Sequence, residues 1–99
     1  MRYGRTGSMR TTPGHRDDVV AILCSGADGL RAGGCSLYVV GIDPADDARI
    51  WVTEVWESHE HHAASLHLPE TKAAIASAMP MLTGEFTVQE MNVVGGLGV

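Results

Sequence analysis

The chain has 99 residues, 44% of them hydrophobic, and a formal net charge of −5 at pH 7. This length suits one two-layer core and is too short for a second, and the apolar share is that of a folded domain and not of a disordered chain. The acidic balance argues against nucleic acid and anionic membranes as partners, because both select Lys and Arg patches. We therefore expect one domain over residues 1–99, with residues 94–99 as a C-terminal tail.

The sequence also bears on where the protein resides. No apolar run approaches the roughly 20 residues that span a bilayer, and no apolar segment follows the N-terminal charges as in a secretory signal. Cys24 and Cys35 lack the short spacing of metal ligands, so we expect two buried, reduced thiols, with a disulfide or a reactive thiol as the alternative. These features predict a cytoplasmic protein without a membrane partner.

The first half of the chain predicts a strand, a helix and a second strand. Tyr3–Met9 reads as a short first or edge strand, followed by a break at Pro13-Gly14. Apolar residues then recur at three- and four-residue steps, which predicts an amphipathic helix that ends at Gly33-Gly34; they are Val19, Ile22, Leu23, Ala27 and Leu30. The β-branched and aromatic run Cys35–Ile42 predicts a strand.

A hairpin is expected next. Residues 43–47 are rich in Asp and Pro, as turns are, and Arg49–Glu57 reads as its second strand. Apolar side chains alternate onto both faces of that strand, which indicates that both faces are covered. Ile50, Val52 and Trp56 lie on one face, and Trp51 and Val55 on the other.

The remaining elements are predicted from their boundary residues. Ser58 is suited to cap a helix, and Pro69 fits the first turn of a further helix. An alanine-rich helix over Lys72–Met79 follows, with Ile75, Met79 and Leu82 facing inward. Thr83-Gly84 is expected to turn the chain into a last strand, Glu85–Val94.

The predicted order is β-α-β-β-α-β, which is the ferredoxin-like α+β arrangement. One helix layer would cover one face of a four-stranded antiparallel sheet. The other apolar face needs a partner, and in so short a chain we expect this to be a second copy, giving a homodimer.

The third predicted strand and its surroundings resemble one family. The run Val52–Ser58, then His62, Ser65-Leu66 and Pro69, is similar to the antibiotic biosynthesis monooxygenases, also called quinol monooxygenases. Pro13-Gly14, Gly34–Tyr38 and Val93–Gly96 add to the resemblance, which covers nearly the whole chain. It implies a dimeric α+β barrel with a pocket between sheet and helices. Characterised members oxidise phenols or quinols without metal, flavin or haem, whereas others degrade haem.

Two candidates for chemistry lie on the predicted strand Arg49–Glu57. Glu54 shares a face with large apolar side chains, and burial would raise its pKa and make it a usable base. Alternatively, it is an acid satisfied by Arg49, a backbone donor or a partner subunit. Trp56 could stack on a planar substrate and donate a hydrogen bond, or be a core residue.

The other candidates surround this strand. His62 matches the family's histidine, and its neutral imidazole could accept a proton from a phenol or anthrone; the alternative is a capping or surface histidine. Tyr38 is a pocket-wall or core residue, and Ser65 is expected at the substrate. Ser65 also stands about where the haem-degrading branch carries a tryptophan, which disfavours haem degradation.

A metal site is not expected. His59, His61, His62 and His67 lack the H-E-x-x-H spacing that places two ligands and a base on one helix face. The resemblance implies a cofactor-independent monooxygenase acting with O₂ on a phenol, quinol or anthrone, with Glu54 or His62 as the base. A non-catalytic ligand-binding module on the same fold and a haem-binding relative are the competing hypotheses.

Overall fold

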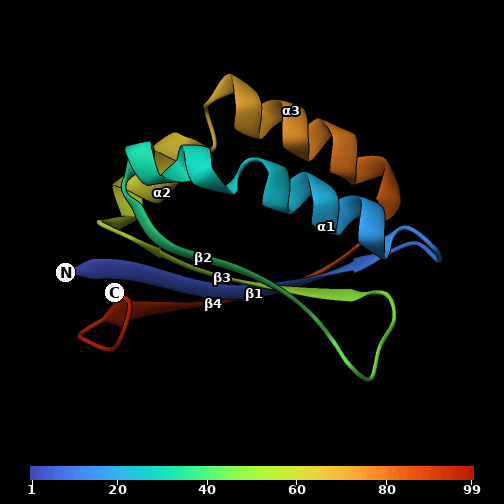
Figure 1. Cartoon of the computed structure of the whole chain (residues 1–99), viewed down its shortest axis with the longest axis horizontal. Coiled ribbons are helices and arrows are strands. Elements are labelled where there is room, and N and C mark those ends of the chain that lie inside the picture. Colours follow the sequence, from blue (N-terminus) through green and yellow to red (C-terminus); the bar gives the residue numbers. More distant parts are fainter.

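The computed structural model describes all 99 residues and shows a four-stranded antiparallel sheet with helices on one face (Figure 1). The strands lie in the order β2-β3-β1-β4. This arrangement confirms the predicted ferredoxin-like fold. The elements are β1 (Arg2–Thr11), α1 (Arg16–Ser25), the 3₁₀ helix η1 (Ala27–Gly33), β2 (Cys35–Ile42), β3 (Arg49–Trp56), α2 (His59–Ser65), α3 (Pro69–Ala78), the 3₁₀ turn η2 (Met79–Met81) and β4 (Leu82–Val93).

Strand β1 is longer than predicted and is central, not an edge. It pairs with β3 on one side and β4 on the other, so that Arg5 lies opposite Glu54 and Glu90. Its glycines obscured this in the sequence. A Cβ at Gly4 would come within 2.8 Å of Met91 Cγ, and one at Gly7 within 2.8 Å of a β4 carbonyl oxygen. The glycines here permit close contact with β4.

The predicted first helix is in fact two elements. α1 ends at Ser25, and η1 follows after Gly26. Each glycine in an α-helix costs about 1 kcal/mol relative to alanine, and this segment carries Gly26 and Gly29 before it ends. Gly34 closes η1 at φ +102°, a conformation that favours glycine.

The boundaries predicted for the second half are mostly correct. Ser58 caps α2, and its Oγ accepts a hydrogen bond from the His61 N–H at 3.1 Å. Pro69 begins α3. The turn predicted at Thr83-Gly84 is wrong, because β4 starts at Leu82 and runs through Gly84 at φ +90°. The register with β1 shifts there, between Met9 and Thr11.

The core lies between the sheet and the helices, in two clusters. One contains Val19, Ile50, Val52 and Ala78, and the other contains Tyr3, Cys35 and Trp56. Cys35 is buried as predicted, but the prediction for Cys24 is wrong, because that thiol is exposed. No helix combines the length and the apolar character that a membrane crossing requires.

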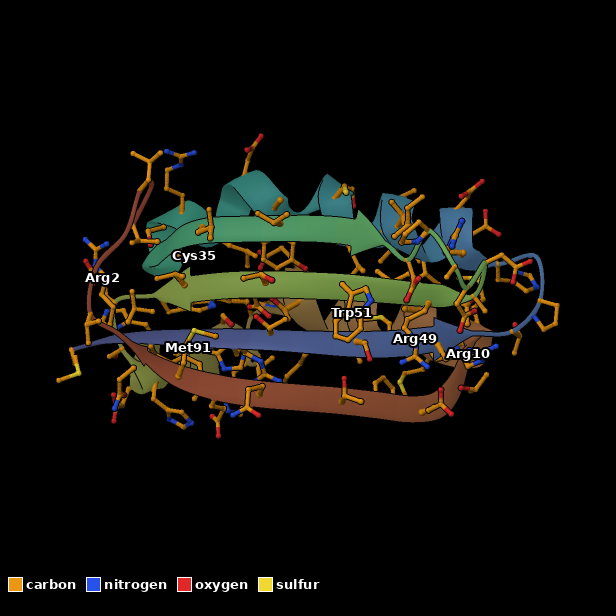
Figure 2. All side chains as sticks on the ribbon, turned by 90° about the horizontal axis from the view of Figure 1, so that it is seen from below. Arg2, Arg10, Cys35, Arg49, Trp51 and Met91 are labelled. Carbon is orange, nitrogen blue, oxygen red and sulfur yellow. The ribbon has the colours of Figure 1, made fainter.

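The outer face of the sheet carries no helix, and Figure 2 shows Trp51 and Met91 lying on it. Trp51 is 39% exposed, Met91 45% and Val39 51%, whereas Val55 on the same face is buried. The inner-face residues Ile50, Val52 and Trp56 are all buried. No helix of the chain therefore covers the outer face of β3, where Trp51 stays partly exposed.

Candidate functional site

A cavity of about 810 Å³ lies between the sheet and the helices, in the apolar layer of the fold. Fourteen of the 22 residues that line it are hydrophobic. The 22 residues come from the helical elements α1, η1, α2, α3 and η2 and their connections on one side and from all four strands on the other. Four of the five predicted site residues, Tyr38, Glu54, Trp56 and Ser65, line this cavity, and His62 does not.

The inward-facing side chains predicted around the last helix also belong to this cavity. Ile75, Met79 and Leu82 all line it. Ile75 remains 45% exposed and Met79 52%. These two residues therefore lie where the cavity meets solvent.

Glu54 is the ionisable group that β3 places at the polar end of the cavity. The Trp56 Nε1–H donates a hydrogen bond to its Oε1 at 3.0 Å. The Arg5 Nε lies 3.9 Å from its Oε2, in a pair whose side chains are 25% and 16% exposed. Burial raises the pKa of Glu54, while the Trp56 hydrogen bond and then the Arg5 charge act to lower it.

Arg49, one of the partners considered for Glu54, is on the other face of the sheet. Its guanidinium donates to Ser8 Oγ at 3.1 Å and to Glu85 Oε2 at 3.2 Å. The alternation of side chains along β3 separates residues 49 and 54 onto opposite faces. The cation that lies near Glu54 is Arg5 from β1.

Trp56 and Tyr38 form the aromatic part of the wall. Trp56 is 1% exposed, and a Cβ on Gly33 would lie 3.7 Å from its ring, so η1 passes close to the indole. Its N–H is already used by Glu54. Burial, followed by the Glu54 charge, raises the pKa of Tyr38 to about 12, so this phenol stays protonated.

His62 lies beside Glu54 and is buried, so the surface alternative is wrong. Its Nε2 is 3.9 Å from Glu54 Oε1 and accepts a hydrogen bond from Arg5 Nη1 at 3.4 Å. Burial lowers the pKa of His62 to about 4, with the charges of Arg5 and His59 acting in the same direction. The imidazole is therefore neutral near pH 7, and its Nε2 lone pair is engaged by Arg5.

Ser65 contributes less chemistry than its position suggests. Its side chain is buried, and its Oγ donates to the His62 carbonyl at 2.6 Å. The hydroxyl therefore closes the last turn of α2. It borders the cavity mainly as a small polar side chain.

Arg5 was missed by sequence reasoning, although it contacts both predicted bases. Its place at the site follows from the pairing of β1 with β3, which sets Arg5 opposite Glu54. A polar pair adjoins it, where the Tyr3 hydroxyl donates to Glu90 Oε2 at 2.6 Å. No local motif marks any of these residues.

The histidine-rich start of α2 does not assemble a ligand set. His61 pairs with Glu57 at 3.2 Å, and His59 lies 3.9 Å from Glu90. His62 turns inward instead. No group of three or more His, Cys, Asp or Glu side chains is placed to hold a metal ion.

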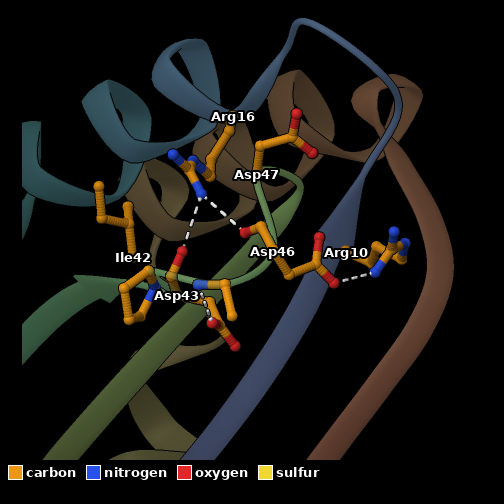
Figure 3. Close-up of a pocket in the computed structure, with 8 residues that line it drawn as sticks. Arg10, Arg16, Ile42, Asp43, Asp46 and Asp47 are labelled. Carbon is orange, nitrogen blue, oxygen red and sulfur yellow. Dashed lines mark hydrogen bonds and ion pairs between the residues drawn. The ribbon is translucent and has the colours of Figure 1, made fainter.

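A second hollow, of about 620 Å³, adjoins the β2–β3 loop (Figure 3). Arg16 donates to the backbone carbonyls of Asp43 and Asp46 at 3.3 and 2.8 Å, and Arg10 pairs with the Asp46 carboxylate. Both guanidinium groups thus hold the loop in place. This hollow is a consequence of how the hairpin is anchored.

The comparisons with known proteins agree on one family. The model of the antibiotic biosynthesis monooxygenases matches residues 3–77. A crystal structure from Chloroflexus aurantiacus assigned to that family is 47% identical, covers 97% of this chain and 96% of its own, and has a TM-score of 0.87.

More distant structures share the fold. One from Caulobacter crescentus is 18% identical over 95% of this chain and 91% of its own, with a TM-score of 0.85. One from Mycobacterium tuberculosis is 16% identical, with a TM-score of 0.83, and the match covers 98% of this chain and 99% of the Mycobacterium chain. No curated protein matches the chain in sequence. On the family model and the Chloroflexus relative, the chain belongs to the antibiotic biosynthesis monooxygenase family.

Proposed function

We propose that this protein is a monooxygenase that oxidises a phenol, quinol or anthrone with O₂ and takes the electrons from the substrate itself. The observation that carries the proposal is Glu54, a carboxylate placed in the wall of a largely apolar cavity and oriented by Trp56. Such a cavity suits a planar aromatic molecule. A carboxylate whose pKa is raised by burial suits proton abstraction near neutral pH.

Of the two bases considered, we assign the role to Glu54. It lines the cavity, whereas His62 does not. The His62 Nε2 lone pair is engaged by Arg5, and its pKa of about 4 makes it a weak base. His62 and Arg5 act as positioning residues for the carboxylate.

The reaction can be written with an anthrone as the example. Glu54 removes a proton from the ring CH₂, and the resulting anion transfers one electron to O₂. The substrate radical and superoxide combine into a C–O bond, and protonation gives a hydroperoxide. Loss of the second CH₂ hydrogen as a proton breaks the O–O bond, which yields the ketone and one water. The cavity contributes exclusion of water and a fixed position for the base.

We further propose that the protein acts as a homodimer that joins the outer faces of two sheets. The support is the exposure of Val39, Trp51 and Met91 on a face that no helix of the chain covers. Solvated apolar side chains gathered on one face are typical of an interface. The small-molecule site lies on the opposite face of the sheet.

The test is aerobic incubation with a panel of quinols and anthrones, following quinone absorbance and O₂ uptake. We expect turnover by the wild type and a loss of about 100-fold or more in kcat for Glu54→Gln, which removes the general base. His62→Ala should slow the reaction less. Turnover that Glu54→Gln leaves unchanged would overturn this mechanism.

The competing hypotheses make different predictions. A ligand-binding module would bind quinols without consuming O₂. None of the five histidines lines the cavity, so a haem placed there would find no imidazole to ligate its iron. We therefore expect no Soret shift when haemin is added to the protein.

A further inference from the structure

The charged groups of the cavity wall are all of one sign. Its 22 lining residues include two carboxylates, Glu54 and Glu70, and no Lys, Arg or His. The chain has seven Lys and Arg residues and five histidines, and none of these twelve side chains lines the cavity. An anionic ligand would find no cation with which to pair.

The cation beside Glu54 is already engaged. Arg5 lies behind Glu54, with its Nε 3.9 Å from Oε2 and its Nη1 bonded to His62. Glu90 also stands opposite Arg5 across the β1–β4 pairing. The Trp56 N–H is likewise given to Glu54. Arg5 and the Trp56 N–H therefore already compensate the negative charge of Glu54, and neither is free to pair with an anionic ligand.

The N-terminus of α3, which could attract an anion, already carries a carboxylate. A helix N-terminus favours negative charge, and the first turn of α3 lies at the cavity. Glu70 in that turn places its own carboxylate there. Entry of a second anion at this position would bring like charges together.

We propose that the cavity selects ligands without an ionised acid group, so that the substrate is an uncharged phenol, quinol or anthrone and not a carboxylate, sulfonate or phosphate ester. Burial of an unpaired anion among apolar walls is strongly unfavourable. Proton abstraction by Glu54 does not conflict with this selection. It moves the existing negative charge from the carboxylate to the substrate and adds none. The statement about turnover rests on the proposed function, whereas the statement about binding does not.

Binding is tested with three naphthalene ligands of matched ring structure: 1,4-dihydroxynaphthalene, its 2-carboxamide and its 2-carboxylate. The measurement is anaerobic titration of Trp56 fluorescence in the Trp51→Phe variant, since Trp51 lies on the outer face and would add background. We expect the carboxamide to bind within a few-fold of the parent quinol. The carboxylate should bind at least about tenfold more weakly than the carboxamide.

The carboxamide separates charge from size, and variants identify the source of the discrimination. Glu70→Gln and Glu54→Gln should each reduce the ratio of the Kd of the carboxylate to the Kd of the carboxamide. Glu85→Gln is the matched control, because Glu85 pairs with Arg49 on the outer face, and it should leave the ratio unchanged.

Three results would overturn the proposal: equal binding of carboxylate and carboxamide, tighter binding of the carboxylate, or a ratio that neither Glu70→Gln nor Glu54→Gln alters. Failure of the oxygenase mechanism is recognised separately. In that case, the quinol and carboxamide bind and the carboxylate does not, yet no ligand supports O₂ uptake.

Discussion

Arg5 and His62 contact Glu54 without lining the cavity, so their roles can be separated from substrate binding. The Arg5 charge acts to lower the pKa of Glu54. Replacement by Gln should therefore raise the pKa of that carboxyl further. If Glu54 is the base, as proposed, it must be ionised to act, so the acidic limb of the kcat/KM profile should move to higher pH by about one unit.

The conservative variant makes this prediction specific. Arg5→Lys retains the charge and should keep the acidic limb near its wild-type position. Arg2→Gln is the control, since Arg2 is exposed at the start of the same strand. An unshifted limb in Arg5→Gln, with activity merely reduced, would show that Arg5 is structural only.

His62 should make the stability of the protein depend on pH. Its pKa is about 4 in the fold and about 6.5 in an unfolded chain. The unfolded state therefore binds the proton more readily, and folding stability is lost as pH falls through this window. We expect the free energy of unfolding to drop by at most about 2 kcal/mol from pH 7 to pH 5 on this account.

Urea unfolding at pH 7 and pH 5 measures this loss. His62→Gln retains an acceptor for Arg5 but does not titrate. Its free energy of unfolding should therefore fall less between pH 7 and pH 5 than that of the wild type, by up to about 2 kcal/mol. His67→Gln, at an exposed position, should behave like the wild type. Equal losses in His62→Gln and wild type would contradict the buried, neutral imidazole.

The site residues that the sequence predicted are those on a strand that the sequence also predicted. Glu54 and Trp56 alternate with apolar neighbours on β3, so their common face followed from a period of two. Arg5 could not be found in this way. Its glycine-containing strand has a weak pattern, and its partner on β3 is 49 positions away in sequence.

At the level of elements, η1 brings the backbone close to the indole of Trp56, and Gly34 fixes where that element ends. A Cβ at Gly34 would lie 2.8 Å from the His61 ring, at a φ of +102°. Gly34→Ala should destabilise the fold by about 1–2 kcal/mol, because a residue with a Cβ is strained in the left-handed conformation. The contact with His61 should add about 1 kcal/mol or more.

Gly14→Ala separates these two contributions. Gly14 also has a positive φ, of +82°, but a Cβ there would meet nothing within 4 Å. Urea unfolding should therefore show a larger loss for Gly34→Ala than for Gly14→Ala. Equal losses would mean that His61 moves aside freely.

The elements that the sequence predicted well are those whose boundaries are set by local chemistry. Ser58 and Pro69 mark helix starts through a cap and a fixed φ, which need no tertiary information. The passage of β4 through Gly84 depends on the pairing of β4 with β1, which no local signal predicts. A glycine reads as a turn in sequence, whereas here Gly84 lies within a paired strand.

At the scale of the whole molecule, the two faces of the sheet have different occupants. The inner face, which the helices cover (Figure 1), carries the cavity, and the outer face presents apolar side chains such as Trp51 and Met91 to solvent (Figure 2). The alternating pattern of β3 predicted cover on both sides. Because the chain is short, that pattern also predicted a second copy as the cover of the outer face, and this stays a prediction.

The homodimer proposed for this face predicts a mass of twice the chain by light scattering. Val39→Glu and Met91→Glu each place a charge on the outer face, where both native side chains are about half exposed. Burial of an unpaired charge in an interface costs several kcal/mol, so both variants should elute as monomers. Ala76→Glu, on the exposed side of α3, should remain dimeric. A monomeric wild type, or variants that stay dimeric, would place the partner surface elsewhere.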